Sequence, residues 1–110
     1  MKDRIVNILG TDYKILNQKV LNNQKLKNAD GLCEGYSKEI VLNDFEIDEM
    51  TYSNIEDYKK KVIRHEVIHA YLMESGLAGN SEWAENEEMI DWIALQIPKL
   101  VKTMEELNIL

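Results

Sequence analysis

The feature that most constrains this chain is a pair of histidines four residues apart, His65 and His69, with Glu66 directly after the first. Residues at this spacing lie on one face of an α-helix, so both imidazoles can reach one metal ion while the glutamate reaches a water on that ion. The sequence contains no other histidine. The pattern predicts a helical zinc site, with His65 and His69 as metal ligands and Glu66 as the general base.

The residues around this motif favour a long helix. Neither Gly nor Pro occurs between Ser53 and Ser75, and Ser53 or Asn54 can cap the N-terminus. Ser75 and Gly76 together form a typical C-terminal stop. We therefore expect a helix of about 20 residues that ends near Ser75, which is longer than average but within the natural range.

Short apolar runs precede the predicted helix. Residues 4–9 and 13–16 flank a Gly-Thr-Asp turn, which predicts a β-hairpin. Residues 32–36 and 39–42 flank a second turn and predict another hairpin. The segment 19–27 has too weak a pattern to assign.

Helical periodicity returns after the metal-binding motif. It restarts near Ser81 and reaches Ile97, and Pro98 should end or kink this helix because proline lacks the amide donor. A final helix is expected from Leu100 to Leu107. Trp83 and Trp92 are expected in the core at this spacing, with a position at an interface as the alternative. The acidic residues 43–51 are expected to form a solvated loop before the first helix. The whole pattern predicts one α+β domain over residues 1–110.

Composition and charge exclude several classes of partner. The net charge is −7 and the one basic run is Lys59–Lys61, which argues against nucleic acid. No apolar run is long enough for a signal peptide or a membrane span, so we expect a cytoplasmic protein without a membrane partner. The single cysteine, Cys33, is expected to be a small half-buried apolar residue.

A catalytic zinc usually takes three protein ligands, so a third is needed. It must be a carboxylate unless Cys33 is recruited, and an acidic segment follows at residues 82–91. Within it, residues 86–91 read Asn-Glu-Glu-Met-Ile-Asp, which resembles the Asn-Glu-x-x-x-Asp motif of gluzincin metallopeptidases. The resemblance implies that Glu87 is the third ligand and that Asp91 holds one ligand imidazole through its other ring N–H. Glu88 and Glu85 remain the alternatives for the ligand.

The chain also resembles the small ImmA/IrrE-type metallopeptidases encoded by phages and prophages, over roughly residues 30–98. That resemblance implies a minimal zincin-like domain. In such a domain, short N-terminal antiparallel strands precede the helix with the HExxH motif, here residues 65–69, and a C-terminal acidic helix completes the zinc site. The implied function is hydrolysis of a peptide bond in a specific protein partner, with zinc-bound water activated by Glu66.

Two further expectations concern the substrate. An exposed strand at Glu39–Leu42 is expected to hold a peptide by strand addition. Tyr52, Tyr71 or Arg64 would stabilise the transition-state oxyanion, because no third histidine exists. The alternative function is a non-catalytic zinc-binding interaction or regulatory module of a phage or prophage, in which the metal contributes to folding.

Overall fold

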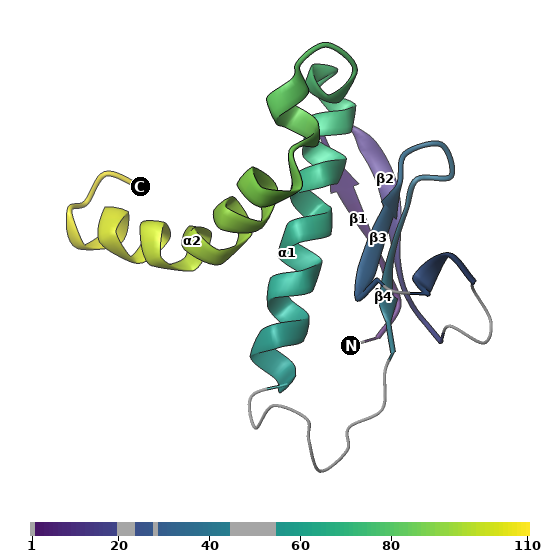
Figure 1. Cartoon of the computed structure of the whole chain (residues 1–110). Coiled ribbons are helices and arrows are strands. Elements are labelled where there is room, and N and C mark those ends of the chain that lie inside the picture. Colours follow the sequence, from purple (N-terminus) through teal and green to yellow (C-terminus); the bar gives the residue numbers. More distant parts are fainter. Residues whose placement is uncertain (1, 20–23, 28, 45–54) are drawn as a thin grey trace.

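The described part of the chain forms a four-stranded sheet with one helix packed on it (Figure 1). A second helix leads away from the sheet. The structure is a computed structural model, and it describes residues 2–19, 24–27, 29–44 and 55–110. The expected α+β class is confirmed. The main elements are β1 (Arg4–Ile8), β2 (Thr11–Gln18), β3 (Gly31–Glu34), β4 (Glu39–Asn43), α1 (Ile55–Glu74) and α2 (Glu87–Glu106), with short 3₁₀ helices at Gln24–Leu26, Leu77–Gly79 and Glu82–Glu85.

Both predicted hairpins are confirmed, but the sheet is not purely antiparallel as expected. β1 pairs with β2 and β3 pairs with β4 in antiparallel fashion, whereas β2 pairs with β4 in parallel. The strand order is β1-β2-β4-β3, so β4 lies between β2 and β3. Ile40, Val41 and Leu42 are all buried, which is typical of a central strand covered on both faces.

This strand order corrects the expected position of the exposed strand. Glu39–Leu42 belongs to β4, which has hydrogen-bonded neighbours on both sides and cannot accept a further strand. Among the described residues, β3 pairs only with β4 and is an edge of the sheet. The edge strands are therefore β1 and β3, and β3 is the edge beside β4 whose unpaired backbone groups can receive an extended peptide.

α1 packs on the sheet through a continuous apolar core. Its buried residues come from β1, β2, β4 and α1. Successive side chains of a strand point to opposite faces of the sheet, so every second side chain can contact the apolar side of α1. The members of this core are Ile8, Tyr13, Ile15, Ile40, Leu42, Val62, Ile63 and Ala70.

Glu74 fixes the end of α1 to the two hairpins. Its carboxylate accepts hydrogen bonds from Tyr13 Oη at 3.1 Å and Thr11 Oγ1 at 3.4 Å, and it pairs with Lys38 Nζ at 2.8 Å. The ammonium of Lys38 is the main reason that the pKa of Glu74 lies below its usual value. Burial, with the Glu74 carboxylate second, raises the pKa of Tyr13 to about 12. These contacts fix the position of the C-terminal end of α1 relative to the two hairpins.

The predicted end of α1 is confirmed. The helix ends at Glu74, and Gly76 follows with φ of 85°, a left-handed conformation that glycine adopts without strain. The expected N-terminal caps, Ser53 and Asn54, lie outside the described residues. So does most of the expected acidic loop, since residues 45–54 are not described.

α2 begins later than expected. Residues Glu82–Glu85 form a 3₁₀ helix, and α2 starts after Asn86, whose Oδ1 accepts a hydrogen bond from the Met89 N–H at 2.8 Å. This side chain is an N-cap, which satisfies one of the free amides at a helix start. A second apolar cluster of Leu72, Ala84 and Ile90 joins this part of the chain to α1.

Of the two expectations at Pro98, an end and a kink, the end is wrong, and so is the separate final helix after it. α2 continues through Pro98 to Glu106. Proline has no amide hydrogen for the carbonyl four residues earlier, which belongs to Ala94. Arg64 Nε donates to that Ala94 oxygen at 2.7 Å instead. A side chain from α1 thus satisfies the carbonyl that Pro98 leaves free, and the helix continues.

We expect Arg64→Ala to lower the free energy of unfolding by about 1–3 kcal/mol, because it leaves the carbonyl of the buried Ala94 without its charged donor. Urea unfolding of the metal-free protein measures the change. The matched control is Pro98→Ala, which returns an amide donor to the Ala94 carbonyl. In the Pro98→Ala background, Arg64→Ala should lower the free energy of unfolding by clearly less. An equal decrease in both backgrounds would contradict this role of Arg64.

The expectation that the two tryptophans are core residues is wrong. Trp83 is 44% exposed and Trp92 is 62% exposed. Trp92 follows the buried Ile90 by two residues, which turns it to another side of α2. In the described part of the chain, no helix is both long enough and apolar enough to cross a membrane.

Candidate metal centre

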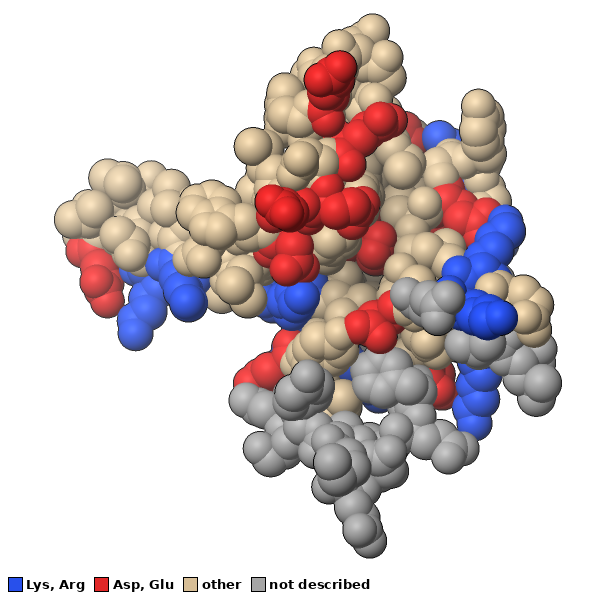
Figure 2. All heavy atoms as spheres, viewed as in Figure 1, with Lys and Arg blue, Asp and Glu red and all other residues tan. Residues whose placement is uncertain are grey.

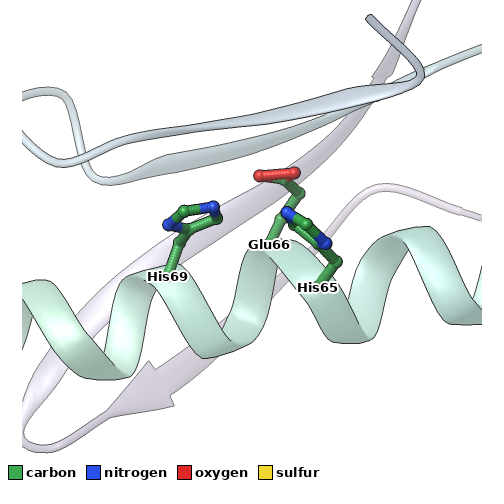
Figure 3. Close-up of side chains that lie close together, drawn as sticks. All are labelled: His65, Glu66 and His69. Carbon is green, nitrogen blue, oxygen red and sulfur yellow. The ribbon is translucent and has the colours of Figure 1, made fainter. Parts of the chain in front are cut away.

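His65, Glu66 and His69 project from α1 towards the same space (Figure 3). The histidine ring centroids are 5.0 Å apart, and one nitrogen or oxygen of each of the three side chains lies within 4.8 Å of the others. The histidine side chains are about 15% exposed and Glu66 is buried. Helical spacing alone accounts for the pair of imidazoles, as predicted.

The start of α2 brings Glu87 to both histidines. Glu87 Oε2 lies 2.9 Å from His65 Nε2, and Glu87 Oε1 lies 2.8 Å from His69 Nε2. Of the three acids considered as third ligand, Glu87 is therefore the one whose oxygens meet the histidine nitrogens. Glu85 lines the same hollow, and Glu88 is exposed on the next position of the helix.

Asp91 lies one helical turn after Glu87 and contacts the other side of the His65 ring. Its Oδ1 is 3.1 Å from His65 Nδ1 and 2.9 Å from Lys61 Nζ. The Lys61 ammonium is the main cause of the lowered pKa of Asp91. An ionised carboxylate only accepts hydrogen bonds, so His65 donates from Nδ1 to Asp91, and a metal ion would take the place of the proton that lies between Nε2 and Glu87 in the metal-free protein. That orientation is the one a metal ligand needs.

The donor set fits zinc. Two imidazole nitrogens and one carboxylate are a usual set for a catalytic zinc, and bonds of roughly 2.0–2.1 Å in tetrahedral geometry place ligand atoms about 3.3 Å apart. The distances from Glu87 to His65 and His69, 2.9 and 2.8 Å, need to open by only a few tenths of an ångström. Burial lowers the pKa of His69, which favours the neutral form that binds metal.

The Glu66 carboxyl group has a raised pKa in this site. Burial raises its pKa to about 7, the positive form of His65 opposes that shift, and the carboxylate of Glu87 adds to it. A base with a pKa near the working pH transfers protons most effectively at neutrality. The side chain that the sequence predicts as the base thus has the appropriate pKa in the metal-free protein.

A cleft of about 590 Å³ opens in front of these side chains, between β3 and the two helices. Gly31 on β3 allows the close approach: an added Cβ there would lie 2.8 Å from Val62 Cγ1 and 3.3 Å from Glu66 Cγ. Acidic side chains gather on the face where α1 meets α2 (Figure 2). At the other end, the cleft is lined by Cys33, Met73 and Ala78.

Several residues of the cleft do not appear among the sequence-based candidates. Tyr58 and Lys61 line it, and the Tyr58 hydroxyl donates to Asp30. Tyr58 lies seven residues before His65, two turns along the same helix face, and that spacing is the signal that could have identified it. Cys33 is half-buried, as expected, and burial raises its pKa to about 12.

The structure does not support two of the expected oxyanion donors, and it leaves the third undescribed. Arg64 is bound to the Ala94 carbonyl, and Tyr71 is 44% exposed. Neither is among the described residues that line the cleft. Tyr52 lies outside the described residues.

We expect Asp91→Ala to weaken zinc affinity by roughly 10- to 100-fold, the usual effect of removing the partner of a ligand histidine. His65 would then lose the acceptor that keeps Nε2 free for the metal. Competition with a chromophoric chelator measures the affinity. Glu88→Ala is the matched control on the same helical turn and should leave affinity unchanged. Equal affinities of all three proteins would show that Asp91 is only a surface charge.

Comparisons of the chain with protein-family models, with curated proteins and with solved structures found no match. The resemblance to gluzincins and to ImmA/IrrE-type proteins remains a prediction from the HExxH motif and residues 86–91.

Proposed function

We propose that the protein is a zinc-dependent metallopeptidase that hydrolyses a peptide bond in a specific protein partner. The observation that carries this proposal is the buried Glu66 carboxylate next to two imidazoles and the Glu87 carboxylate, in the wall of an open cleft. A site that only held a metal for stability would need His65, His69 and Glu87 alone. A buried base beside the ligands is required when water must be deprotonated.

In this proposal each residue has a defined task. His65, His69 and Glu87 hold the metal, and Asp91 orients the His65 ring. When bound, zinc supplies Lewis-acid chemistry, lowering the pKa of water and polarising a carbonyl group. Glu66 accepts the proton of the attacking water on its carboxylate and then delivers it to the nitrogen of the leaving amine.

The edge strand β3 supports the assignment of a peptide as substrate. Its residues Gly31, Leu32 and Cys33 line the cleft opposite His65 and Glu66. An extended peptide can add to this edge through backbone hydrogen bonds, which places a peptide carbonyl beside the site without need of a particular side chain. Strand addition to β3 replaces the expected addition to β4.

Metal-dependent cleavage tests the proposed function. Zinc-loaded and chelator-treated protein are each incubated with the intact proteins of a bacterial lysate and with a peptide mixture derived from them, and mass spectrometry identifies new peptide termini. We expect about one zinc per chain by elemental analysis and new termini only with the zinc-loaded protein. Bound zinc without cleavage of peptides or of intact partner proteins would refute the peptidase and favour the non-catalytic zinc-binding module.

A further inference from the structure

One end of the cleft in front of the metal centre is apolar. We call it the apolar end, and it is lined by Cys33, Met73, Ala78 and Ala84. Cys33 Sγ lies 4.0 Å from Met73 Sδ, and an added Cβ at Gly35 would lie 2.8 Å from the same sulfur. The Met73 side chain therefore packs against β3 and the residue that follows it.

The opposite end of the cleft is polar. It is lined by Asp30, Tyr58 and Lys61, and the Tyr58 hydroxyl donates to Asp30. At the apolar end, Ala84 belongs to the second apolar cluster of the fold and Ala78 packs against that cluster. Because each alanine side chain is a single methyl group, this wall leaves room for a side chain of a bound peptide. The two ends of the cleft therefore present different surfaces to a peptide that lies along it.

The apolar end lies close to the metal centre. Met73 follows His69 by four residues, which is one turn or about 6 Å along α1. An extended peptide advances by about 3.3 Å per residue. A peptide with one carbonyl group at the metal centre therefore reaches the apolar end with a side chain that is one or two residues away from that carbonyl.

The apolar end is shielded from water and disfavours negative charge. Burial, with the Glu66 carboxylate second, raises the pKa of Cys33 to about 12. The same two causes act on the carboxylate of a substrate side chain at this position. Among the described residues of the cleft, five are acidic and the one Lys or Arg, Lys61, is paired with Asp91. An acidic side chain is therefore disfavoured at the apolar end, whereas an apolar side chain gains free energy by leaving water.

We propose that the apolar end binds a large apolar side chain of the peptide substrate, such as leucine, methionine or phenylalanine, within two residues of the bond that is cut. The inference rests on the proposed peptidase function, because the metal centre defines where that bond lies. The thioether of Met73 adapts to side chains of different shape, and sulfur makes favourable contacts with aromatic rings. The bound side chain belongs to the peptide that adds to the edge of β3, since Cys33 is part of that strand.

Binding of amino-acid hydroxamates to the zinc-loaded full chain tests the apolar end. The hydroxamate group anchors the probe on zinc, which places the side chain of the probe within one residue of the metal. Isothermal titration compares the N-acetyl hydroxamates of glycine, leucine, phenylalanine and aspartate. We expect the leucine and phenylalanine probes to bind roughly 10- to 100-fold more tightly than glycine, and aspartate to bind no better than glycine. Equal affinities of the four probes would overturn the proposal.

A substitution at Met73 separates the apolar end from the rest of the cleft. Met73→Lys keeps an unbranched side chain and adds a positive charge, so it should lower the preference for leucine over glycine by roughly 10-fold and raise the affinity for aspartate. Tyr71→Lys is the matched control, because Tyr71 is 44% exposed on α1 and is not among the described residues that line the cleft. This control should keep the wild-type order of affinities. Equal changes in both variants, or no change in a folded and zinc-loaded Met73→Lys protein, would contradict the proposal.

Methyl NMR of the wild-type chain provides a test that needs no variant. The methyl signals of Met73 and Ala78 should shift with the leucine probe more than with the glycine probe, and equal shifts would argue against the apolar end as the binding site. Preference for apolar probes without cleavage of any peptide would refute the peptidase but support the apolar end. Cleavage without any preference among the probes would support the peptidase and refute this inference. A chain that binds no zinc contradicts both.

Discussion

Replacing Glu66 with Gln is expected to reduce peptide cleavage by about 10²- to 10⁴-fold while zinc remains bound. Glutamine keeps the shape of the side chain but cannot accept the proton from water. His65, His69 and Glu87 are unchanged, so zinc stoichiometry should stay at that of the wild type. The rate of appearance of new termini in the peptide mixture provides the measurement. Equal rates for wild type and variant would remove Glu66 from the mechanism.

The same substitution is expected to stabilise the metal-free protein at neutral and basic pH. The pKa of Glu66 rises from 4.5 to about 7 on folding, chiefly through burial. The stability contributed by Glu66 is therefore fully present below pH 4.5 and is lost as the pH rises through 7, by up to about 3 kcal/mol. The glutamine of the variant causes no such loss, because its side chain does not ionise.

Urea unfolding with chelator present, at pH 5 and pH 8, measures this difference. We expect wild type and Glu66→Gln to be similar at pH 5 and the variant to be more stable at pH 8. Glu88→Gln, which changes an exposed carboxylate, is the control and should follow the wild type. If both variants show the wild-type pH dependence, the Glu66 carboxylate is not held in an unfavourable environment.

Replacing Glu87 with Gln is expected to weaken zinc binding by roughly 10²- to 10³-fold. The binding free energy of zinc in protein sites is about 10–16 kcal/mol, so each of three or four ligands contributes roughly 3–4 kcal/mol. Chelator competition measures the affinity, with Glu88→Gln as the control one position further along α2. Loss of zinc from the Glu88 variant, with affinity preserved in the Glu87 variant, would exchange the roles of the two acids.

The candidate site could be predicted from sequence to the extent that it depends on helical spacing. His65 and His69 share a face of α1, and Glu87 and Asp91 share a face of α2, because residues four apart are neighbours on any helix. That α2 meets α1 at this point depends on distant contacts such as Leu72 with Ile90. Only the resemblance to a metallopeptidase motif indicated that juxtaposition in advance.

Two of the wrong expectations concern contacts between residues far apart in the chain. Pro98 would end an isolated helix, but Arg64, 34 residues earlier, satisfies the Ala94 carbonyl. The turns predict β3 and β4 as a hairpin, yet nothing in the turns indicates that β4 lies between β2 and β3. Short-range patterns specify elements and turns, whereas strand order is decided by the packing of the whole core.

The N-cap at Asn86 has a consequence for how the length of such a chain can vary. Because the Asn86 side chain fixes where α2 begins, residues gained or lost in the largely exposed stretch 79–83, before the buried Ala84, can be absorbed without turning the helix. A single insertion between Glu87 and Asp91 would instead rotate one acid by about 100° relative to the other. Related sequences should therefore differ freely in length before the Asn-Glu pair and keep a constant spacing after it.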